Sequence, residues 1–255
     1  MPIQELINNP QAFLMDLLVS LPAILVALVF HETAHGYAAY RCGDPTAKMM
    51  GRLSLNPLKH LDPVGTLLMI FAGFGWARPV PVNPGNFRRG RRDDLIVSLA
   101  GITVNVILFL FFTLVTQIMI TLAIRFDSWA WSSRDAAELV RWAPLWAQDM
   151  IAEFWGRPFA IGYEVISNLA IINLSLALFN LLPIPPLDGY HVFNDLVFKK
   201  DLSASSRVAQ IAGSILFVVV LTTDYIGQGI GWVVTHAVEG LGIAYHFIMS
   251  LAGWL

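Results

Sequence analysis

The sequence predicts an all-α polytopic membrane protein with about five to six transmembrane helices and a short re-entrant or β segment around residues 47–82. Three observations support this class. First, 56% of the residues are apolar and 13% are charged, whereas soluble domains have about 45–50% and about 25%. Second, several apolar runs approach or exceed the roughly 20 residues that cross a bilayer. Third, a Gly- and Pro-rich stretch separates the first two runs. We expect residues 1–255 to form a single membrane-embedded domain.

The composition excludes other classes of protein. A formal net charge of −2 leaves no basic face for phosphates, so we expect no nucleic-acid partner. The single cysteine, Cys42, excludes an internal disulfide framework and a metal cluster held by cysteines alone. The lipid bilayer is the expected surrounding, and the sequence leaves the oligomeric state open.

The membrane helices are placed by the apolar runs. Three long runs cover 11–40, 95–124 and 161–182. A fourth, 208–223, is slightly shorter than a usual span. The tail, 226–255, is apolar but rich in glycine, and it fits either a last span or a helix lying on the membrane interface.

Between the first two runs, the apolar part of the irregular segment, 64–76, is too short for a span. Irregular backbone is tolerated at membrane depth only where it is buried in protein or lines a cavity. We therefore expect a segment that enters and leaves on one side of the membrane, next to a cavity.

Basic residues predict the orientation. The loops 41–60, 78–92 and 187–207 hold 12 of the 16 Lys and Arg residues, whereas the loop 125–160 is rich in tryptophan. The positive-inside rule places the first three loops in the cytoplasm and the Trp-rich loop at the outer interface. The N-terminus is then expected outside.

The sequence HETAH, residues 31–35, lies near the end of the first run. Positions i and i+4 share a helix face, so His31 and His35 can bind one Zn²⁺. Glu32 lies beside the first ligand, where it can take a proton from a water activated by zinc. The alternative is a pair of core histidines with an acid that reaches the surface. That alternative is disfavoured because residues 17–30 carry no charge, and burying unpaired ionisable groups is costly.

A catalytic zinc usually has three protein ligands. Asp188 is the best third candidate, because Pro183, Pro185 and Pro186 end the third apolar run and let the chain unwind before it. Asp188 could equally form a turn or an N-cap. Asn180, still within the apolar run, could bind a substrate backbone or orient a ligand, with helix packing as the alternative.

Other polar residues are weaker candidates for a role in the metal site. His191 and Asp195 could act as a substitute ligand or as partners of the site, although a cytoplasm-facing helix surface is favoured. His60 and Asp62, in the irregular segment, could hydrogen-bond a ligand histidine.

The motifs HETAH, LAGITVN (residues 99–105) and FNLLPIPPLDG, in this order, resemble the site-2 protease family of intramembrane zinc metalloproteases. The resemblance runs from about residue 25 to about residue 200. It implies that His31, His35 and Asp188 are the ligands of one zinc ion, that Glu32 is the catalytic base, and that Asn180 contacts the substrate or transition state. It also implies a substrate with a transmembrane segment, a site towards the cytoplasm and, from the smaller relatives, a prokaryotic cell membrane.

Two departures from the family pattern stand out. The middle motif usually begins Gly-Pro, whereas this chain has Gly101-Ile102. No loop has the length of a PDZ or CBS domain, so a minimal core protease is expected. The predicted function is regulated intramembrane proteolysis, and the rivals are a metal-ion transporter with a His/Asp transit site and an inactive scaffold.

Overall fold

The structure is a computed structural model that describes residues 2–72, 75–126, 140, 145, 151–152, 156–198, 216–217 and 223–254. The secondary structure of these residues is helical, and no strand forms among them. Three helices are long and apolar enough to cross a membrane, namely α2 (Pro10–Cys42), α5 (Arg91–Phe126) and α9 (Arg157–Asn180). They cover the three long predicted runs, which confirms the all-helical class and is consistent with an integral membrane protein.

The predicted number of spans is too high for the described part of the chain, which contains three candidates instead of about five to six. Most of the fourth run, 208–223, and most of the Trp-rich loop fall outside the described residues. The tail does form a helix, α12 (Asp224–Leu251). It is not one of the candidate spans, and glycines and histidines spread along it dilute its apolar side chains.

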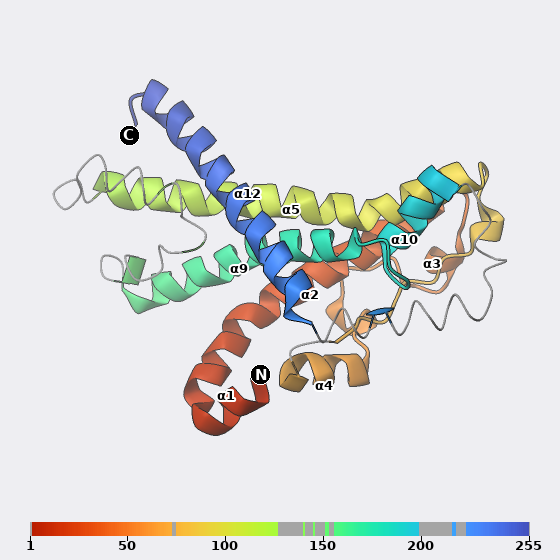
Figure 1. Ribbon diagram of the computed structural model, residues 1–255, viewed down its shortest axis with the longest axis horizontal. Coiled ribbons are helices and arrows are strands. Elements are labelled where there is room, and N and C mark those ends of the chain that lie inside the picture. Colours follow the sequence, from red (N-terminus) through yellow and green to blue (C-terminus); the bar gives the residue numbers. More distant parts are fainter. Residues whose placement is uncertain are drawn as a thin grey trace.

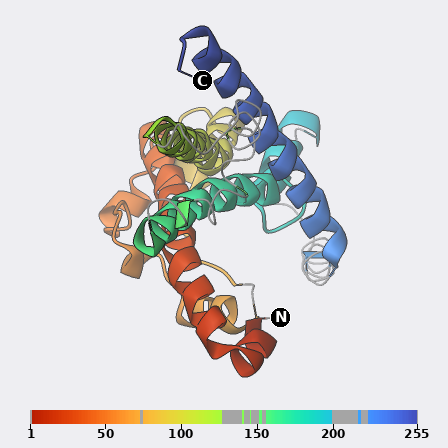
Figure 2. The same ribbon diagram turned by 90° about the vertical axis from the view of Figure 1, so that its left-hand side faces the viewer.

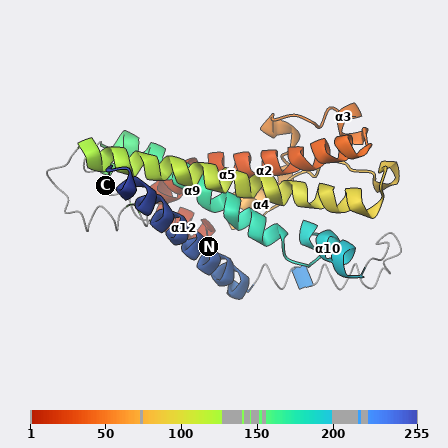
Figure 3. The same ribbon diagram turned by 90° about the horizontal axis from the view of Figure 1, so that it is seen from above.

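The helices α2, α5 and α9 pack against one another and form the centre of the fold. Figure 1 shows α5 alongside α9, with α12 crossing them obliquely, and Figure 3 shows the same crossing from above. In Figure 2 the first helix, α1 (Pro2–Asn8), projects away from this centre with the N-terminus. Buried apolar side chains join α5, α9 and α12, and they are Phe109, Ala170, Leu174, Val234 and Val238.

The two ends of α2 follow from its sequence. Asn9 separates α1 from α2, and its side chain accepts a hydrogen bond from the Ala12 amide, with Pro10 at the first helical position. At the other end, Gly43 has φ 114°, a left-handed conformation that glycine adopts without strain and that ends the helix. The chain then turns at Asp44 into the irregular segment.

The predicted segment 47–82 contains α3 (Thr46–Met49), a 3₁₀ turn η1 (Pro57–Lys59) and the ten-residue helix α4 (Pro63–Ala72). The expected β structure is wrong for its described residues, in which one antiparallel bridge joins Leu61 to Ala77. Prolines at 79 and 81 lack the backbone N–H that a longer ladder needs. The bridge nevertheless brings Leu61, before α4, beside Ala77, after it, so the chain doubles back around α4.

Candidate metal centre

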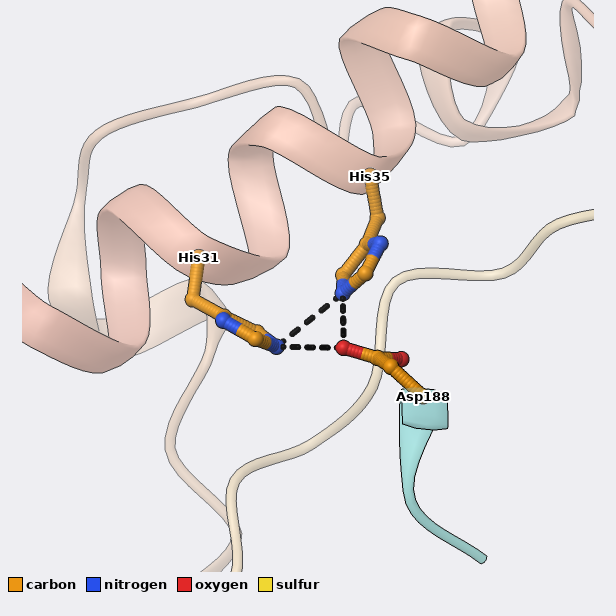
Figure 4. Close-up of side chains that lie close together, drawn as sticks. All are labelled: His31, His35 and Asp188. Atoms are coloured by element: carbon orange, nitrogen blue, oxygen red, sulfur yellow. Dashed lines mark hydrogen bonds and ion pairs between the residues drawn. The ribbon is translucent and has the colours of Figure 1, made fainter. Parts of the chain in front are cut away.

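The two histidines of HETAH lie one turn apart on α2, and their rings converge on one point (Figure 4). Their Nε2 atoms are 3.0 Å apart. His31 is buried, and the His35 side chain is 12% exposed. The spacing predicted from the sequence therefore puts both imidazoles on one face, inside the protein.

Asp188 approaches these rings from a distant part of the sequence. The helix α9 ends at Asn180, the prolines follow, and α10 (Asp188–Phe193) begins at the aspartate itself. A Cβ atom at Gly189 would overlap the carbonyls of Leu181 and Leu182, so only glycine lets α10 pack this closely against the end of α9. The Asp188 Oδ2 atom lies 3.1 Å from the Nε2 of His31 and 3.1 Å from the Nε2 of His35 (Figure 4).

The other nitrogen of each ring is held by α5. His35 Nδ1 donates to the Val97 carbonyl at 2.8 Å, since a carbonyl can only accept. His31 Nδ1 lies 2.7 Å from Asn105 Oδ1. Gly101 lies between these partners, and the three residues are four apart, so they follow one face of α5. A Cβ atom at Gly101 would lie 2.5 Å from His35 Nε2, so its hydrogen side chain leaves room for the rings.

These contacts leave three hydrogen-bond acceptors facing one another. With Nδ1 carrying the proton, each neutral imidazole has a lone pair on Nε2. An aspartate is ionised near neutral pH and can then only accept hydrogen bonds, so the Asp188 carboxylate supplies the third acceptor. We call the three atoms, His31 Nε2, His35 Nε2 and Asp188 Oδ2, the ligand triangle.

The donor set of the ligand triangle fits zinc. Nitrogen and carboxylate ligands lie about 2.0–2.2 Å from zinc, which puts two tetrahedral ligands about 3.3 Å apart. The sides of the triangle are 3.0 and 3.1 Å. Three buried acceptors at this separation repel one another unless a cation lies between them. The residues brought together here are those that the sequence singled out, and they form the group able to hold a metal ion among the described residues.

Glu32 points to a different partner. Its Oε2 accepts a hydrogen bond of 2.7 Å from the backbone amide of Val80. Val80 belongs to an extended stretch, residues 77–83, which we call the proline strap because Pro79 and Pro81 flank Val80. The Val80 side chain is buried next to Gly36, one turn beyond Glu32 on α2. The strap therefore covers the predicted base.

The proline strap is anchored on both sides of Val80. The buried guanidinium of Arg52 donates from Nη2 to the Arg78 carbonyl at 2.8 Å. The Asn83 amide donates to Asp44 Oδ2 at 2.7 Å. Asp44 also accepts from Asn86 and from Thr46. Burial would raise the pKa of Asp44, but these hydrogen bonds outweigh it and lower the pKa below its ordinary value.

Asn180 forms its hydrogen bond within its own helix. It is the last residue of α9, and its Nδ2 donates to the Leu176 carbonyl of the same helix at 3.0 Å. Within the described residues, no hydrogen bond joins it to His31, His35 or Asp188. The contact with substrate expected for Asn180 stays a prediction.

The weaker candidates also have other partners. His60 Nε2 is 2.7 Å from the Ser54 carbonyl, and Asp62 accepts from the Gly65 amide at the start of α4. The idea that either holds a ligand histidine is therefore wrong, since α5 supplies those contacts. His191 Nδ1 lies 3.5 Å from Asp94, which raises the pKa of His191. Burial, followed by the neighbouring Asp94, raises the pKa of Asp195 to about 6.

Sequence reasoning missed two features of the site. Asn105 was noted only as part of a motif, and Asn173 of α9 was not noted at all. Both are fully buried, and Asn105 Nδ2 donates to Asn173 Oδ1 at 2.7 Å. The available signal was an amide side chain in the middle of an apolar run, where polar residues are expensive and tend to be functional.

Comparisons with known proteins agree with this centre. A family model described as Peptidase family M50 matches residues 19–223. The proposed zinc metalloprotease YwhC of Bacillus subtilis is 39% identical over 217 residues, which cover 84% of each chain. Two proposed zinc metalloproteases named Rip2 are more distant. The one of Mycobacterium tuberculosis is 27% identical over 81% of this chain and 68% of its own.

The Rip2 of Mycolicibacterium smegmatis is 26% identical over 65% of this chain, which spans only 52% of that relative's length. No solved structure matches this chain.

Proposed function

Because the chain belongs to peptidase family M50, the site-2 protease family of zinc metalloproteases, we propose that it hydrolyses a peptide bond in or near the transmembrane segment of a membrane-protein substrate. The proposal covers residues 1–255 as a single membrane-embedded protease domain with one zinc ion per chain. Regulated intramembrane proteolysis is the proposed role.

The observation that carries the proposal is the ligand triangle together with the carboxylate of the next residue. His31, His35 and Asp188 would hold the metal ion, with acceptor atoms 3.0–3.1 Å apart. Glu32 follows the first ligand, and among the described residues its hydrogen bond goes to the Val80 amide and not to the triangle. A separate carboxylate beside a zinc site is what general-base hydrolysis needs, whereas an ion-transit site has little use for it.

The chemistry divides between the metal ion and Glu32. Zinc, when bound by the three ligands, polarises a carbonyl and makes water a better nucleophile. The Val80 amide holds Glu32 Oε2, so Oε1 is the oxygen that accepts a proton as the water oxygen bonds to the carbonyl carbon. Glu32 then gives this proton to the amide nitrogen as the carbon–nitrogen bond breaks, which releases an amine and a carboxylate.

The substrate has to be locally unwound, because an intact helix keeps its carbonyls in hydrogen bonds. The proline strap is extended, and the Val82 amide has no partner among the described residues, so the strap offers a backbone donor to an unwound substrate. The basic loops favour a site towards the cytoplasm and an N-terminus outside. Asn180 is proposed to contact the substrate backbone.

The test pairs bound zinc per chain with cleavage of a transmembrane peptide that carries helix-breaking residues. We expect wild type and Glu32→Gln to bind one zinc each and only wild type to cleave. Asp188→Asn should lose both zinc and cleavage. Asp16→Asn, which changes another acid of α2, should retain both. Cleavage by Glu32→Gln, or absence of zinc from wild type, would overturn the proposal.

A metal-ion transporter is the second candidate, because a His/Asp set can also serve as a transit site. Zinc flux into vesicles separates the two functions. Flux that persists in Glu32→Gln, with no cleavage by wild type, would favour transport. An inactive scaffold predicts neither flux nor cleavage.

A further inference from the structure

We infer that Asn105 is a positioning residue that fixes His31 for zinc, and that Asn173 in turn fixes Asn105, an arrangement we call the asparagine relay. The inference rests on the proposed zinc site and deepens it. His31 lies on α2, Asn105 on α5 and Asn173 on α9, so the relay connects the three central helices.

The hydrogen bonds of the relay can be assigned in one direction only. Asn105 Nδ2 lies 3.2 Å from the Ala27 carbonyl, and a carbonyl accepts, so this atom is the amide nitrogen that donates. The Asn105 oxygen must therefore face His31, and His31 Nδ1 donates to it at 2.7 Å. The proton on Nδ1 leaves the Nε2 lone pair directed at the ligand triangle.

Asn173 fixes the rotation of the Asn105 amide. Its Oδ1 accepts from Asn105 Nδ2 at 2.7 Å, and its own Nδ2 donates to the Leu169 carbonyl at 2.7 Å. A flipped Asn105 would bring its Oδ1 against the oxygens of Ala27 and Asn173, which is repulsive. Both asparagines are 0% exposed, so water cannot replace a missing bond.

The chemistry of the relay suits a site at membrane depth. Many zinc-bound histidines donate their second nitrogen to a carboxylate, but a further buried charge is costly inside a membrane. Here both partners are neutral, since His31 donates to an amide and His35 to the Val97 carbonyl. The hydrogen bonds to the second nitrogen of each ligand histidine therefore add no charge to the site.

The test uses two substitutions of nearly the same size. Asn105→Leu removes the acceptor for His31 Nδ1, whereas Asn105→Asp keeps it. Gln117→Leu is the matched control, because Gln117 is a buried amide of the same helix about 18 Å further along. The first measurement is the zinc dissociation constant of purified protein in competition with a chelator. The second is the ¹⁵N chemical shift of His31 in zinc-free wild type, which reports the proton on Nδ1.

We expect zinc to bind about 10–100-fold more weakly to Asn105→Leu than to wild type. Asn105→Asp should stay closer to wild type than to Asn105→Leu, and Gln117→Leu should bind zinc normally. A packing role for Asn105 predicts the opposite order, because leucine is apolar and aspartate buries a charge. Asn173→Ala should weaken zinc binding less than Asn105→Leu, since it acts through Asn105.

Normal zinc affinity in Asn105→Leu, or equal losses in Asn105→Leu and Gln117→Leu, would overturn the inference. So would a His31 proton on Nε2 in zinc-free wild type, a result that requires no variant to fold. If wild type itself binds no zinc, the proposed function fails instead. The His31 chemical shift then still decides whether the relay exists.

Discussion

Gly101 lies where α5 passes the two ligand histidines, so adding one methyl group there tests the packing of the site directly. A Cβ atom at this position would lie 2.5 Å from His35 Nε2 and 2.6 Å from His31 Cε1. Carbon atoms in ordinary contact are about 3.5–4.0 Å apart, so Gly101→Ala creates an overlap of about 1 Å with both rings.

The rings have little room to give way. Their Nδ1 atoms are held at 2.7 Å by Asn105 and at 2.8 Å by the Val97 carbonyl, and both partners belong to α5 itself. Overpacking of this kind costs about 1–3 kcal/mol. Zinc sites tolerate errors of about 0.2 Å in the metal–ligand distances. We therefore expect the overlap to move the two histidine Nε2 atoms out of the positions that bind zinc. Since about 1.4 kcal/mol corresponds to a tenfold change, zinc affinity should fall about 5- to 150-fold.

The assay is a zinc competition titration, combined with thermal unfolding in detergent with and without zinc. Alanine is a better helix former than glycine by about 0.5–1 kcal/mol, so zinc-free Gly101→Ala should keep most of its stability and lose mainly the stabilisation by zinc. Gly162→Ala in α9 is the control, because among the described residues no atom outside its own stretch of helix lies within 4 Å of its added Cβ. Wild-type zinc affinity in Gly101→Ala would refute the reasoning.

Two further predictions concern the proline strap. Val80→Pro removes the amide that holds Glu32 but suits the extended backbone that Pro81 imposes on residue 80. A hydrogen bond to a charged group contributes about 1.5–3 kcal/mol, so kcat should fall about 10- to 150-fold at unchanged zinc content. The kcat of Val80→Ala and of Val82→Pro should fall less. Equal losses of kcat in Val80→Pro and Val82→Pro would contradict the role of the Val80 amide. For Asp44, a folded-state pKa below its ordinary 3.8 means that the carboxylate contributes stability above that pH, and that this stability is lost as the pH falls through the lowered value. Unfolding temperatures measured from pH 6 to pH 3 should therefore drop more steeply in wild type than in Asp44→Asn, and parallel curves would count against this role.

The sequence singles out the residues of the ligand triangle because the two histidines rest on a strong local rule and a run of prolines precedes Asp188. The i, i+4 spacing fixes the two histidines on one face whatever surrounds them. The prolines before Asp188 ensure that α9 cannot continue through it, and the fold supplies only the approach of α10 to α2. The three long helices follow from apolar run length for the same reason.

The parts that sequence reasoning missed depend on contacts between distant elements. Nothing in the run around Asn173 indicates that its amide meets Asn105, because the pairing is set by the packing of α5 on α9. The β structure expected within residues 47–82 failed because alternating prolines permit an extended backbone but deny the paired donors of a strand. The sequence could not predict the Val80 amide as the partner of Glu32, since every residue except proline has a backbone N–H donor.

The asparagine relay and the proline strap are attached to the central helices in different ways. His31, Asn105 and Asn173 tie α2, α5 and α9 together through hydrogen bonds that lipid cannot replace. Parting these helices at that level would leave buried amides unpaired. Glu32 is covered instead by the proline strap, which contacts α2 through the Val80 amide and the Val80 side chain next to Gly36, and which Arg52 and Asp44 hold on either side. For the proposed substrate, displacing the short strap would break fewer buried hydrogen bonds than parting the three helices that the relay joins.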